Sequence, residues 1–361
     1  MIFAALLFLA LGLMLDRLPQ PFSETLPADV TSGMSSTNQQ LTGTVNNTSL
    51  TPSMNAAFQT QPFAATPTLT LPTRVATQTQ PPPNNLPRSW NQGILVYLLK
   101  NSSGFNSMYT LNLEKGTGPQ LLLQPTSKQH FYGPSLSPDS SKLVFYDING
   151  LDGILDLQDL SVLWIESCNS PTYSPDGTRI ICGQNGHFRI LDAGSGALIR
   201  TLDVGVNGWL PVFSPAGTDV AFSVFGAGGK TTIWRVDAAG GQPVSLASAA
   251  FENYCPAWSP DGNWIAYQSD AAKGNGHSDI WIMDRNGLHK RQITSMQAEW
   301  SRGPVWSPDG KWLAFVSSPS GSVGIEYGDV FVISLDTGEI HQVTDTGATV
   351  ENWRLTWGPA R

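Results

Sequence analysis

From residue 90 onwards the chain alternates between short apolar runs and polar stretches. Three successive runs are 264–267 (Trp-Ile-Ala-Tyr), 279–284 (Asp-Ile-Trp-Ile-Met-Asp) and 290–294 (Lys-Arg-Gln-Ile-Thr). Short β-branched and aromatic runs bounded by Gly, Asn and Asp are typical of strands that are joined by hairpins. Since no stretch in this part carries a convincing helical period, the pattern predicts an all-β domain.

The same order of runs recurs after each copy of a turn sequence whose full form is Trp-Ser-Pro-Asp-Gly. Complete or partial copies stand about 37 to 50 residues apart, at 136–139, 173–177, 213–217, 258–262, 306–310 and 357–359. Pro presets φ at the start of the turn, Asp supplies side-chain hydrogen bonds, and Gly supplies conformational freedom. We interpret these Asp residues as turn formers rather than acid–base groups. Four strands per repeat of this length predict the blade of a β-propeller.

Counting strands predicts how the ring of blades closes. Five turns are each followed by three strands, whereas 354–359 supplies one strand only. Three unassigned strands, at 94–98, 108–113 and 120–123, would complete that last blade. We therefore predict an all-β, six-bladed β-propeller with four-stranded blades over residues 90–361. One C-terminal strand plus three N-terminal strands would close it and hide the open edges.

The motif Ser-Pro-Asp-Gly-x-x-Ile/Leu-Ala-Phe/Tyr, followed by Asp-Ile-Trp-Ile-Met-Asp, resembles the TolB-type ("WD40-like", PD40) propeller repeat. The resemblance covers residues 90–361 and implies the same six-bladed fold. It does not include the α/β domain that precedes the propeller in TolB, because a low-complexity segment stands in that place in this chain.

The first 89 residues differ in composition from the predicted propeller. Residues 2–15 form an apolar run that is shorter than the roughly 20 residues of a spanning helix. We interpret residues 1–17 as a signal or membrane-anchor segment. Residues 18–89 are rich in Thr, Ser, Pro and Gln and cannot bury enough apolar surface to fold, which predicts a disordered stalk. The expected location is extracytoplasmic, periplasmic or at the cell surface, with membrane contact only through the N-terminal segment.

The charge balance and the absence of catalytic motifs exclude several classes of function. With 28 acidic and 20 basic residues, the net charge of −8 argues against a nucleic-acid partner. The sequence contains no Gly-x-Ser-x-Gly elbow, no His-Glu-x-x-His and no phosphate loop. We therefore predict a protein that is not an enzyme, with no catalytic residues, no metal site and no cofactor.

Two short features leave alternatives open. Cys168 and Cys182 flank one of the turns, so a disulfide between them is one interpretation and buried thiols are the other. Residues 147–159 resemble an EF-hand loop, and a Ca²⁺ site near Asp147, Asn149 and Asp152 is the alternative to a plain hairpin. An inserted residue before Asp152 breaks the calcium-loop spacing, and an Asp replaces the Glu at position twelve.

The loops that lead into the innermost strands would ring one mouth of the channel, and they are rich in aromatic and charged residues. The candidate binding residues there are His130, Tyr132, Trp209, Glu252, Tyr254, Glu299, Trp300, Arg302, Glu351, Trp353 and Arg354. Such side chains suit a protein, peptide or glycan partner. The alternative is that aromatic residues wedge between the blades as core, which we expect for Trp258 and Trp306.

Three hypotheses for function follow from this pattern. The first is a membrane-tethered binding or scaffold propeller that recognises a partner at the mouth. The second is a propeller enzyme, a hydrolase or lyase acting on sugars or lactones, whose carboxylates would be Glu252, Glu299 and Glu351. The third is a structural envelope component that self-associates. Convergence of the three carboxyl groups would favour the enzyme, and their divergence would favour binding.

Overall fold

The computed structural model describes most of the second part of the chain, and these residues all lie within the unit Pro67–Arg361. The described ranges are 92–100, 105–116, 118–125, 130–147, 151–166, 168–184, 186–226, 229–273, 277–296, 300–318, 328–345 and 354–360. The predicted segments 1–17 and 18–89 lie outside these residues. Among the residues described, none of the elements is an apolar helix of membrane-spanning length.

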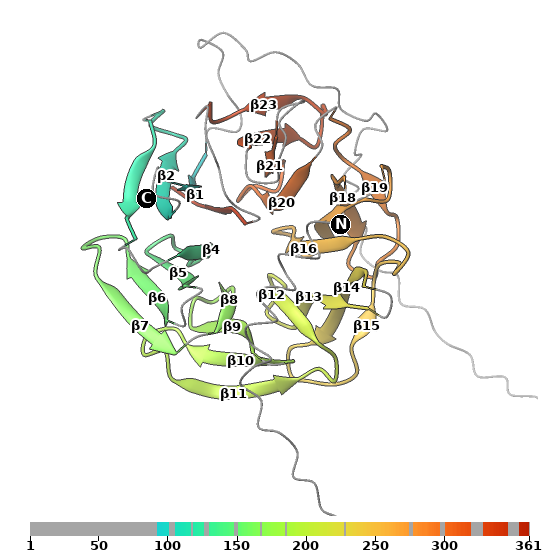
Figure 1. Ribbon diagram of the computed structural model, residues 1–361, viewed down its shortest axis with the longest axis horizontal. Helices are drawn as coiled ribbons and strands as arrows, with labels where there is room; N and C mark the ends of the chain where they lie inside the picture. Colours follow the sequence, from blue (N-terminus) through green and yellow to red (C-terminus); the bar gives the residue numbers. More distant parts are fainter. Residues whose placement is uncertain are drawn as a thin grey trace, which may run out of the picture. The chain divides into compact units, whose positions relative to one another are not determined.

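Six four-stranded antiparallel sheets form the blades of a propeller, and the ribbon in Figure 1 shows them arranged in a ring. From the centre outwards, blade 1 is β4 (Phe131–Leu136), β5 (Lys142–Asp147), β6 (Leu151–Asp156) and β7 (Val162–Glu166). Blade 2 is β8 (Asn169–Tyr173), β9 (Arg179–Gln184), β10 (His187–Asp192) and β11 (Leu198–Asp203). Blade 3 is β12 (Gly208–Phe213), β13 (Asp219–Phe225), β14 (Thr231–Asp237) and β15 (Val244–Ser245).

The remaining blades follow the same order. Blade 4 is β16 (Asn253–Trp258), β17 (Trp264–Ser269), β18 (Asp279–Asp284) and β19 (Arg291–Gln292). Blade 5 is β20 (Ser301–Trp306), β21 (Trp312–Ser317), β22 (Asp329–Ser334) and β23 (Ile340–Gln342). Blade 6 is β24 (Thr356–Gly358), β1 (Ile94–Lys100), β2 (Asn106–Asn112) and β3 (Gln120–Leu123).

Blade 6 closes the ring by joining distant parts of the sequence. β24 pairs with β1 in antiparallel register, with Gly358 opposite Ile94 and Thr356 opposite Val96. The indole Nε1–H of Trp357 donates a hydrogen bond to the Gln92 carbonyl oxygen at 2.7 Å. The predicted closure by one C-terminal and three N-terminal strands is therefore confirmed.

One repeated set of hydrogen bonds holds the Ser-Pro-Asp-Gly turns. Ser307 Oγ–H donates to Asp309 Oδ1 at 2.6 Å, and Ser307 Oγ accepts from the Trp312 N–H at 3.0 Å. The copies that begin at Ser137, Ser174 and Ser259 form the same bonds. A left-handed φ of 71° at Gly310 completes the turn and explains the glycine there. The structure thus agrees with the interpretation of these Asp residues as turn formers.

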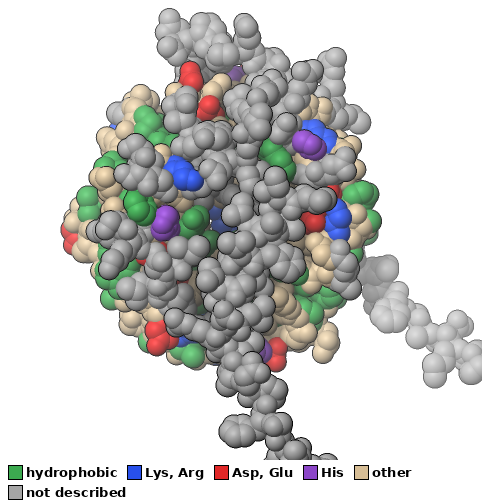
Figure 2. All heavy atoms as spheres, viewed as in Figure 1, with side chains coloured by type: hydrophobic (Ala, Val, Ile, Leu, Met, Phe, Trp, Pro, Cys, Tyr) green, Lys and Arg blue, Asp and Glu red, His purple; other side chains and the backbone are tan. Residues whose placement is uncertain are grey.

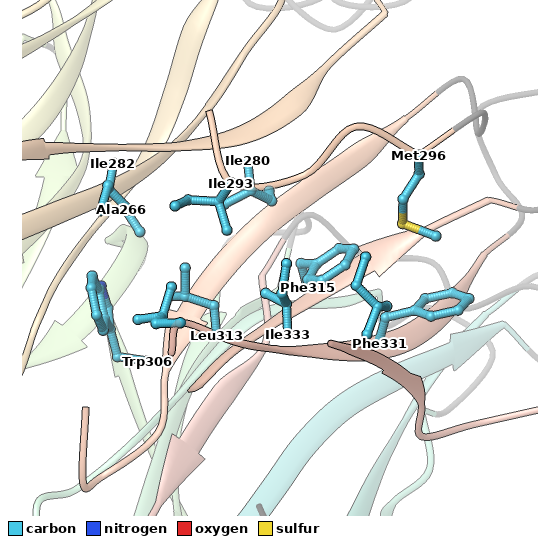
Figure 3. Close-up of a cluster of buried hydrophobic side chains, with 12 residues drawn as sticks. Ala266, Ile280, Ile282, Ile293, Met296, Trp306, Leu313, Phe315, Phe331 and Ile333 are labelled. Carbon is cyan, nitrogen blue, oxygen red and sulfur yellow. The ribbon is translucent and has the colours of Figure 1, made fainter. Parts of the chain in front are cut away.

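Large hydrophobic side chains fill the interfaces between neighbouring blades. Figure 3 shows one such cluster. Its members include Ala266, Ile280, Ile282, Ile293 and Met296 from the side of blade 4 and Trp306, Leu313, Phe315, Phe331 and Ile333 from blade 5. Trp306 Nε1–H also donates across this interface to the Ala257 carbonyl oxygen at 3.0 Å. Trp258 and Trp306 are only 8% and 7% exposed, which confirms their predicted place in the core.

Blades 4 and 5 each contain the same buried polar network, which connects the outermost strand of the blade to the third strand. In blade 4, Thr294 Oγ1–H donates to Asp279 Oδ1 at 3.1 Å, and Gln292 Nε2–H donates to Asp279 Oδ2 at 3.1 Å. The same oxygen of Thr294 accepts from the Ile280 N–H at 2.9 Å. Asp329, Gln342 and Thr344 form the equivalent bonds in blade 5. This network gives a structural reason for the recurring Gln-x-Thr of the fourth strand.

Thr294→Val tests how much this network contributes to stability. Valine has nearly the same shape but leaves the buried Ile280 N–H and the Asp279 carboxylate without the hydroxyl. We expect a loss of about 1–3 kcal/mol in the free energy of unfolding, measured by urea denaturation of the full chain. Thr201→Val, at an exposed position of β11, is the matched control and should change stability by less than about 0.5 kcal/mol. Equal stability of Thr294→Val and the parent would contradict the prediction.

Candidate functional site

The innermost strands of blades 1 to 5 share a β-bulge that shapes the channel. At each bulge a residue with φ between 53° and 56° precedes a proline; these residues are Gly133, Ser170, Leu210, Cys255 and Gly303. Strand pairing shifts register at every one of them. Because the innermost strand has a free edge towards the channel, proline removes no ladder hydrogen bond there. Left-handed φ is costly for Ser, Leu and Cys, so the bulge is imposed by the surrounding fold.

The bulges define two rings of equivalent positions in the channel. We call the bulge residues, with Arg354 as the equivalent in blade 6, the bulge ring. We call the residues one position earlier the mouth ring: Tyr132, Asn169, Trp209, Tyr254, Arg302 and Trp353. Of these, Trp353 lies outside the described residues, as do the candidates Glu299 and Glu351. Sequence reasoning missed the bulges, although the recurring Pro-x-x-Ser-Pro of the first five repeats was a signal for them.

Most aromatic side chains of the mouth ring stack on a neighbour from the same or the next blade. Tyr132 stacks on Tyr146 of β5 with ring centroids 5.5 Å apart. Trp209 stacks on Phe225 at 5.1 Å and 6°, and it meets the ring of Tyr254 edge-on at 6.3 Å. These pairs hold the rings in fixed orientations around the mouth, which is how rigid aromatic anchors are presented to a partner.

Two further candidates, Trp300 and Arg302, form one stacked unit at the mouth of blade 5. The Arg302 guanidinium lies over the Trp300 ring at 4.2 Å, and His277 stacks on the same ring at 5.4 Å. Arg302 is only 6% exposed, and burial lowers the pKa of its guanidinium to about 10. His130 lies at the mouth of blade 1, where its ring packs on Phe105 at 4.8 Å.

Glu252 is held by hydrogen bonds between blades 3 and 4. Its Oε2 accepts from the Thr231 N–H at 3.1 Å, and its Oε1 lies 3.9 Å from Lys230 Nζ. Burial, followed by the charge of Glu252 and its hydrogen bond, raises the pKa of the Tyr254 hydroxyl. The carboxylate of Glu252 therefore acts as a structural acceptor, and its convergence with Glu299 and Glu351 remains an open prediction because those two lie outside the described residues.

Arg354 lies one level deeper than the other candidates, in the bulge ring. Its Cδ lies next to Gly133, and its Nη1–H donates to the Ser170 carbonyl oxygen at 3.4 Å. The Arg354 side chain thus extends from blade 6 to the bulges of blades 1 and 2. Burial lowers the pKa of its guanidinium. Basic side-chain atoms are visible near the centre of the ring in Figure 2, where hydrophobic and acidic groups are interspersed around the rim.

A cavity of about 360 Å³ occupies the channel on the opposite side of the bulge ring from the mouth. All six blades line it, from the bulge to the Ser-Pro turn, and Arg354 and Cys255 lie at its inner end. Its walls include Pro134, Pro256 and Pro304 as well as Trp258, Trp306 and Trp357. The channel therefore has two chemically distinct ends, an aromatic mouth and a proline- and tryptophan-lined cavity, with Arg354 between them.

Two acidic residues of the proposed calcium loop accept hydrogen bonds from backbone N–H groups of neighbouring segments. Asp147 Oδ1 accepts from the His130 N–H at 2.9 Å, and Asp152 Oδ2 accepts from the Cys168 N–H at 2.6 Å. Asn149 lies outside the described residues. Within the part of the chain that the structure describes, no group of three His, Cys, Asp or Glu side chains could hold a metal ion. The Ca²⁺ alternative is neither supported nor tested by these contacts.

Cys168 and Cys182 form a disulfide in blade 2, with their Cα atoms 5.4 Å apart. From the sequence, buried thiols are the favoured interpretation and a disulfide the alternative; the structure shows the disulfide. Cys168 directly precedes β8 and Cys182 lies in β9, so the bond ties the innermost strand to the second strand beside the bulge at Ser170. Cys255 is buried and is not part of a disulfide, and burial raises the pKa of its thiol to about 11.

The ring of six four-stranded blades around a lined channel defines a six-bladed β-propeller protein. Residues 209–358 match the family model PD40, the TolB beta propeller domain. Over these residues the match confirms the resemblance to the TolB-type propeller that the repeats indicate.

Solved structures share this fold at low sequence identity. TolB from Acinetobacter baumannii is 19% identical with a TM-score of 0.59, covering 74% of this chain and 67% of that chain. A putative TolB from Agrobacterium tumefaciens is 19% identical with a TM-score of 0.57, covering 75% and 99%. A chain of the nidogen/laminin complex is 11% identical with a TM-score of 0.58, covering 74% and 100%. No curated protein matches the sequence. At these identities the likeness establishes the fold alone.

Proposed function

We propose that this protein is an extracytoplasmic binding propeller that recognises a polypeptide segment at its mouth ring. The observation that carries the proposal is the set of stacked aromatic side chains there, above all Trp209 between Phe225 and Tyr254. Rigid Trp and Tyr side chains supply large contact areas at a small entropic cost, which is why they dominate protein-binding hot spots.

The polar groups of the described mouth favour a polypeptide over a glycan. Glycan hydroxyls need side-chain acceptors and donors, yet the acceptor Glu252 is engaged by Thr231 and Lys230. Asn253 Nδ2 is likewise engaged, by the carbonyl oxygens of Ser248 and Phe251. Trp300 is instead half-buried, with the buried Arg302 guanidinium against its ring, so this part of the mouth combines exposed aromatic surface with a nearby positive charge, which suits acidic or aromatic side chains of a peptide.

The disulfide supports the extracytoplasmic part of the proposal. Structural disulfides persist in oxidising compartments and are rare in the cytosol. The bond between Cys168 and Cys182 is buried in blade 2, with both residues 0% exposed, as expected of a structural bridge rather than a redox-active one. The proposed tether is the apolar run at 2–15, as the sequence indicates.

A peptide selection on the full chain tests the proposed mouth. Random peptides displayed on phage would be enriched on the immobilised protein, and the winners would be synthesised and titrated by calorimetry. We expect Trp209→Ala to raise the dissociation constant of these peptides about tenfold or more, because truncating a hot-spot Trp typically costs about 2 kcal/mol of binding free energy.

Trp164→Ala is the matched control for this experiment. Trp164 lies on β7 at the outer rim and is 41% exposed, so its removal should leave the peptide affinity unchanged. The proposal fails if the selected peptides bind Trp209→Ala and Tyr132→Ala as tightly as the parent. It also fails if only glycans raise the unfolding midpoint of the protein in a saturable manner.

A further inference from the structure

The cavity on the Ser-Pro-Asp-Gly side of the channel combines apolar walls with a charged inner end. Proline and tryptophan side chains from several blades form the walls, and the volume of about 360 Å³ lies within the usual range of small-molecule sites, about 300–1,000 Å³. None of the mouth-ring side chains lines it. This cavity is therefore separate from the surface on which the proposed function rests.

Arg354 is the only charged member of the bulge ring, whose other five members are Gly, Ser, Leu, Cys and Gly. Gly133 leaves room for its aliphatic stem, and the long bond from Nη1 to the Ser170 carbonyl oxygen is its contact with blade 2. No ion pair within the described ranges involves Arg354. A guanidinium has five N–H donors in a planar fork, so most of the donors of this side chain are not used by the described contacts.

Among the described residues, no negatively charged group pairs with Arg354. Burial lowers the pKa of its guanidinium, and the ionisable groups that act on it are Cys255 and Tyr146. Burial in turn raises the pKa of both the Cys255 thiol and the Tyr146 hydroxyl, so both are neutral near pH 7. The Arg354 side chain is half-buried, so its charge is only partly hydrated, and an anion placed against it would gain from the pairing.

We propose that the cavity binds an apolar molecule or chain end through a carboxylate that pairs with Arg354. The apolar body would lie among Pro134, Pro256, Pro304 and the surrounding tryptophans, and the carboxylate would face the guanidinium at the inner end. Arginine pairs with carboxylates through two parallel N–H···O bonds, which selects this group over a neutral alcohol or amide. The carboxylate can belong to a medium-chain fatty acid or to the C-terminus of a peptide with apolar final residues.

Calorimetry and thermal unfolding of the full chain test this site with defined probes. The probes are octanoate, 1-octanol, acetate, and N-acetyl-Leu-Leu as the free acid and as the C-terminal amide. We expect saturable binding and a raised unfolding midpoint for octanoate, for the peptide acid, or for both. The probe that binds, octanoate or the peptide acid, identifies the source of the carboxylate. We expect 1-octanol, acetate and the peptide amide to bind at least tenfold more weakly, since each lacks one half of the recognised structure.

Arg354→Gln should weaken binding of the carboxylate probe about tenfold or more, because a charge-assisted hydrogen bond is lost. Arg302→Gln is the matched variant: it removes the neighbouring arginine of the mouth ring, which does not line the cavity, and should have a clearly smaller effect. If Arg354→Gln does not fold, Val212→Trp, which fills the cavity from β12, should abolish binding of the same probe.

Three results would overturn the inference. The first is the absence of saturable binding for both carboxylate probes at millimolar concentration. The second is 1-octanol binding as tightly as octanoate. The third is an equal loss of affinity in Arg302→Gln and Arg354→Gln, which would indicate a general charge effect. The peptides selected at the mouth ring serve as an independent readout, because their binding depends on Trp209 and should persist in Val212→Trp.

Discussion

Asp152→Asn should make the protein more stable at pH 8.5 by about 2–4 kcal/mol and change its stability little near pH 4. Asp152 is fully buried in β6, and burial raises the pKa of its carboxyl group to about 7. The Cys168 N–H donates to Oδ2, and the Asp147 N–H and the charge of Arg189 also favour the ionised form, but together they offset only part of the cost of burying a carboxylate. Asparagine keeps an acceptor for that N–H and carries no charge.

The direction of the pH dependence follows from the raised pKa. The unfolded chain releases the Asp152 proton near pH 4, whereas the folded protein retains it until about pH 7. The stabilising contribution of the protonated carboxyl is therefore fully present below about pH 4 and is lost as the pH rises through about 7. Urea denaturation of the parent and Asp152→Asn at pH 4, 6 and 8.5 measures the difference, in which the titration of all other groups cancels.

Calcium provides the control for this prediction. If Asp152 were an ionised ligand of Ca²⁺ together with Asp147, Asn substitution would destabilise the protein at pH 8.5, and added EDTA would lower the stability of the parent towards that of the variant. Lower stability of Asp152→Asn at pH 8.5 would thus contradict the prediction and revive the calcium alternative. Greater stability, unaffected by EDTA, would support a buried carboxyl group with a raised pKa and no bound cation.

Removal of the disulfide should have the second largest effect on stability. The double variant Cys168→Ala/Cys182→Ala loses a bond between residues 14 positions apart, and closing a loop of that size typically contributes about 3 kcal/mol. Reductant should lower the unfolding midpoint of the parent and leave that of the double variant unchanged. Calorimetric scans with and without reductant measure both effects.

Cys255→Ala distinguishes the bridge from the free thiol. Cys255 is buried and unbridged, so a protein that lacks it should keep the sensitivity of the parent to reductant. Detection of three titratable thiols in the denatured, unreduced parent would show that Cys168 and Cys182 are not joined. In that case the support for an oxidising compartment would also be lost.

The blade architecture could be predicted because each repeat carries strong local signals at a regular spacing. A complete or partial copy of the Ser-Pro-Asp-Gly turn marks the end of every innermost strand. The surplus strands at both ends of the domain leave closure of blade 6 as the consistent arrangement. The Gln-x-Thr of blades 4 and 5 was visible as sequence, but its pairing with Asp279 and Asp329 depends on contacts between strands.

The site was predicted only in part, because strand register alone does not reveal bulges. The mouth positions of Tyr132, Trp209, Tyr254 and Arg302 follow from counting back from the turns. The sequence assigned Arg354 to the mouth together with these residues. It lies one position later in its repeat than they do, which places it in the bulge ring, where it lines the cavity. Similarly, the spacing of Cys168 and Cys182 could not establish a disulfide, because bridging depends on the distance between their Cα atoms.

The pairing of β24 with β1 fixes the order in which the molecule can be completed during synthesis. Blades 1 to 5 are each contiguous in sequence, so they can form from local segments as these leave the ribosome. β1 must wait with an unpaired edge until Thr356–Gly358 has been translated. Closure of blade 6 therefore follows translation of β24, and until then the inner edge of β1 has no partner strand from its own blade.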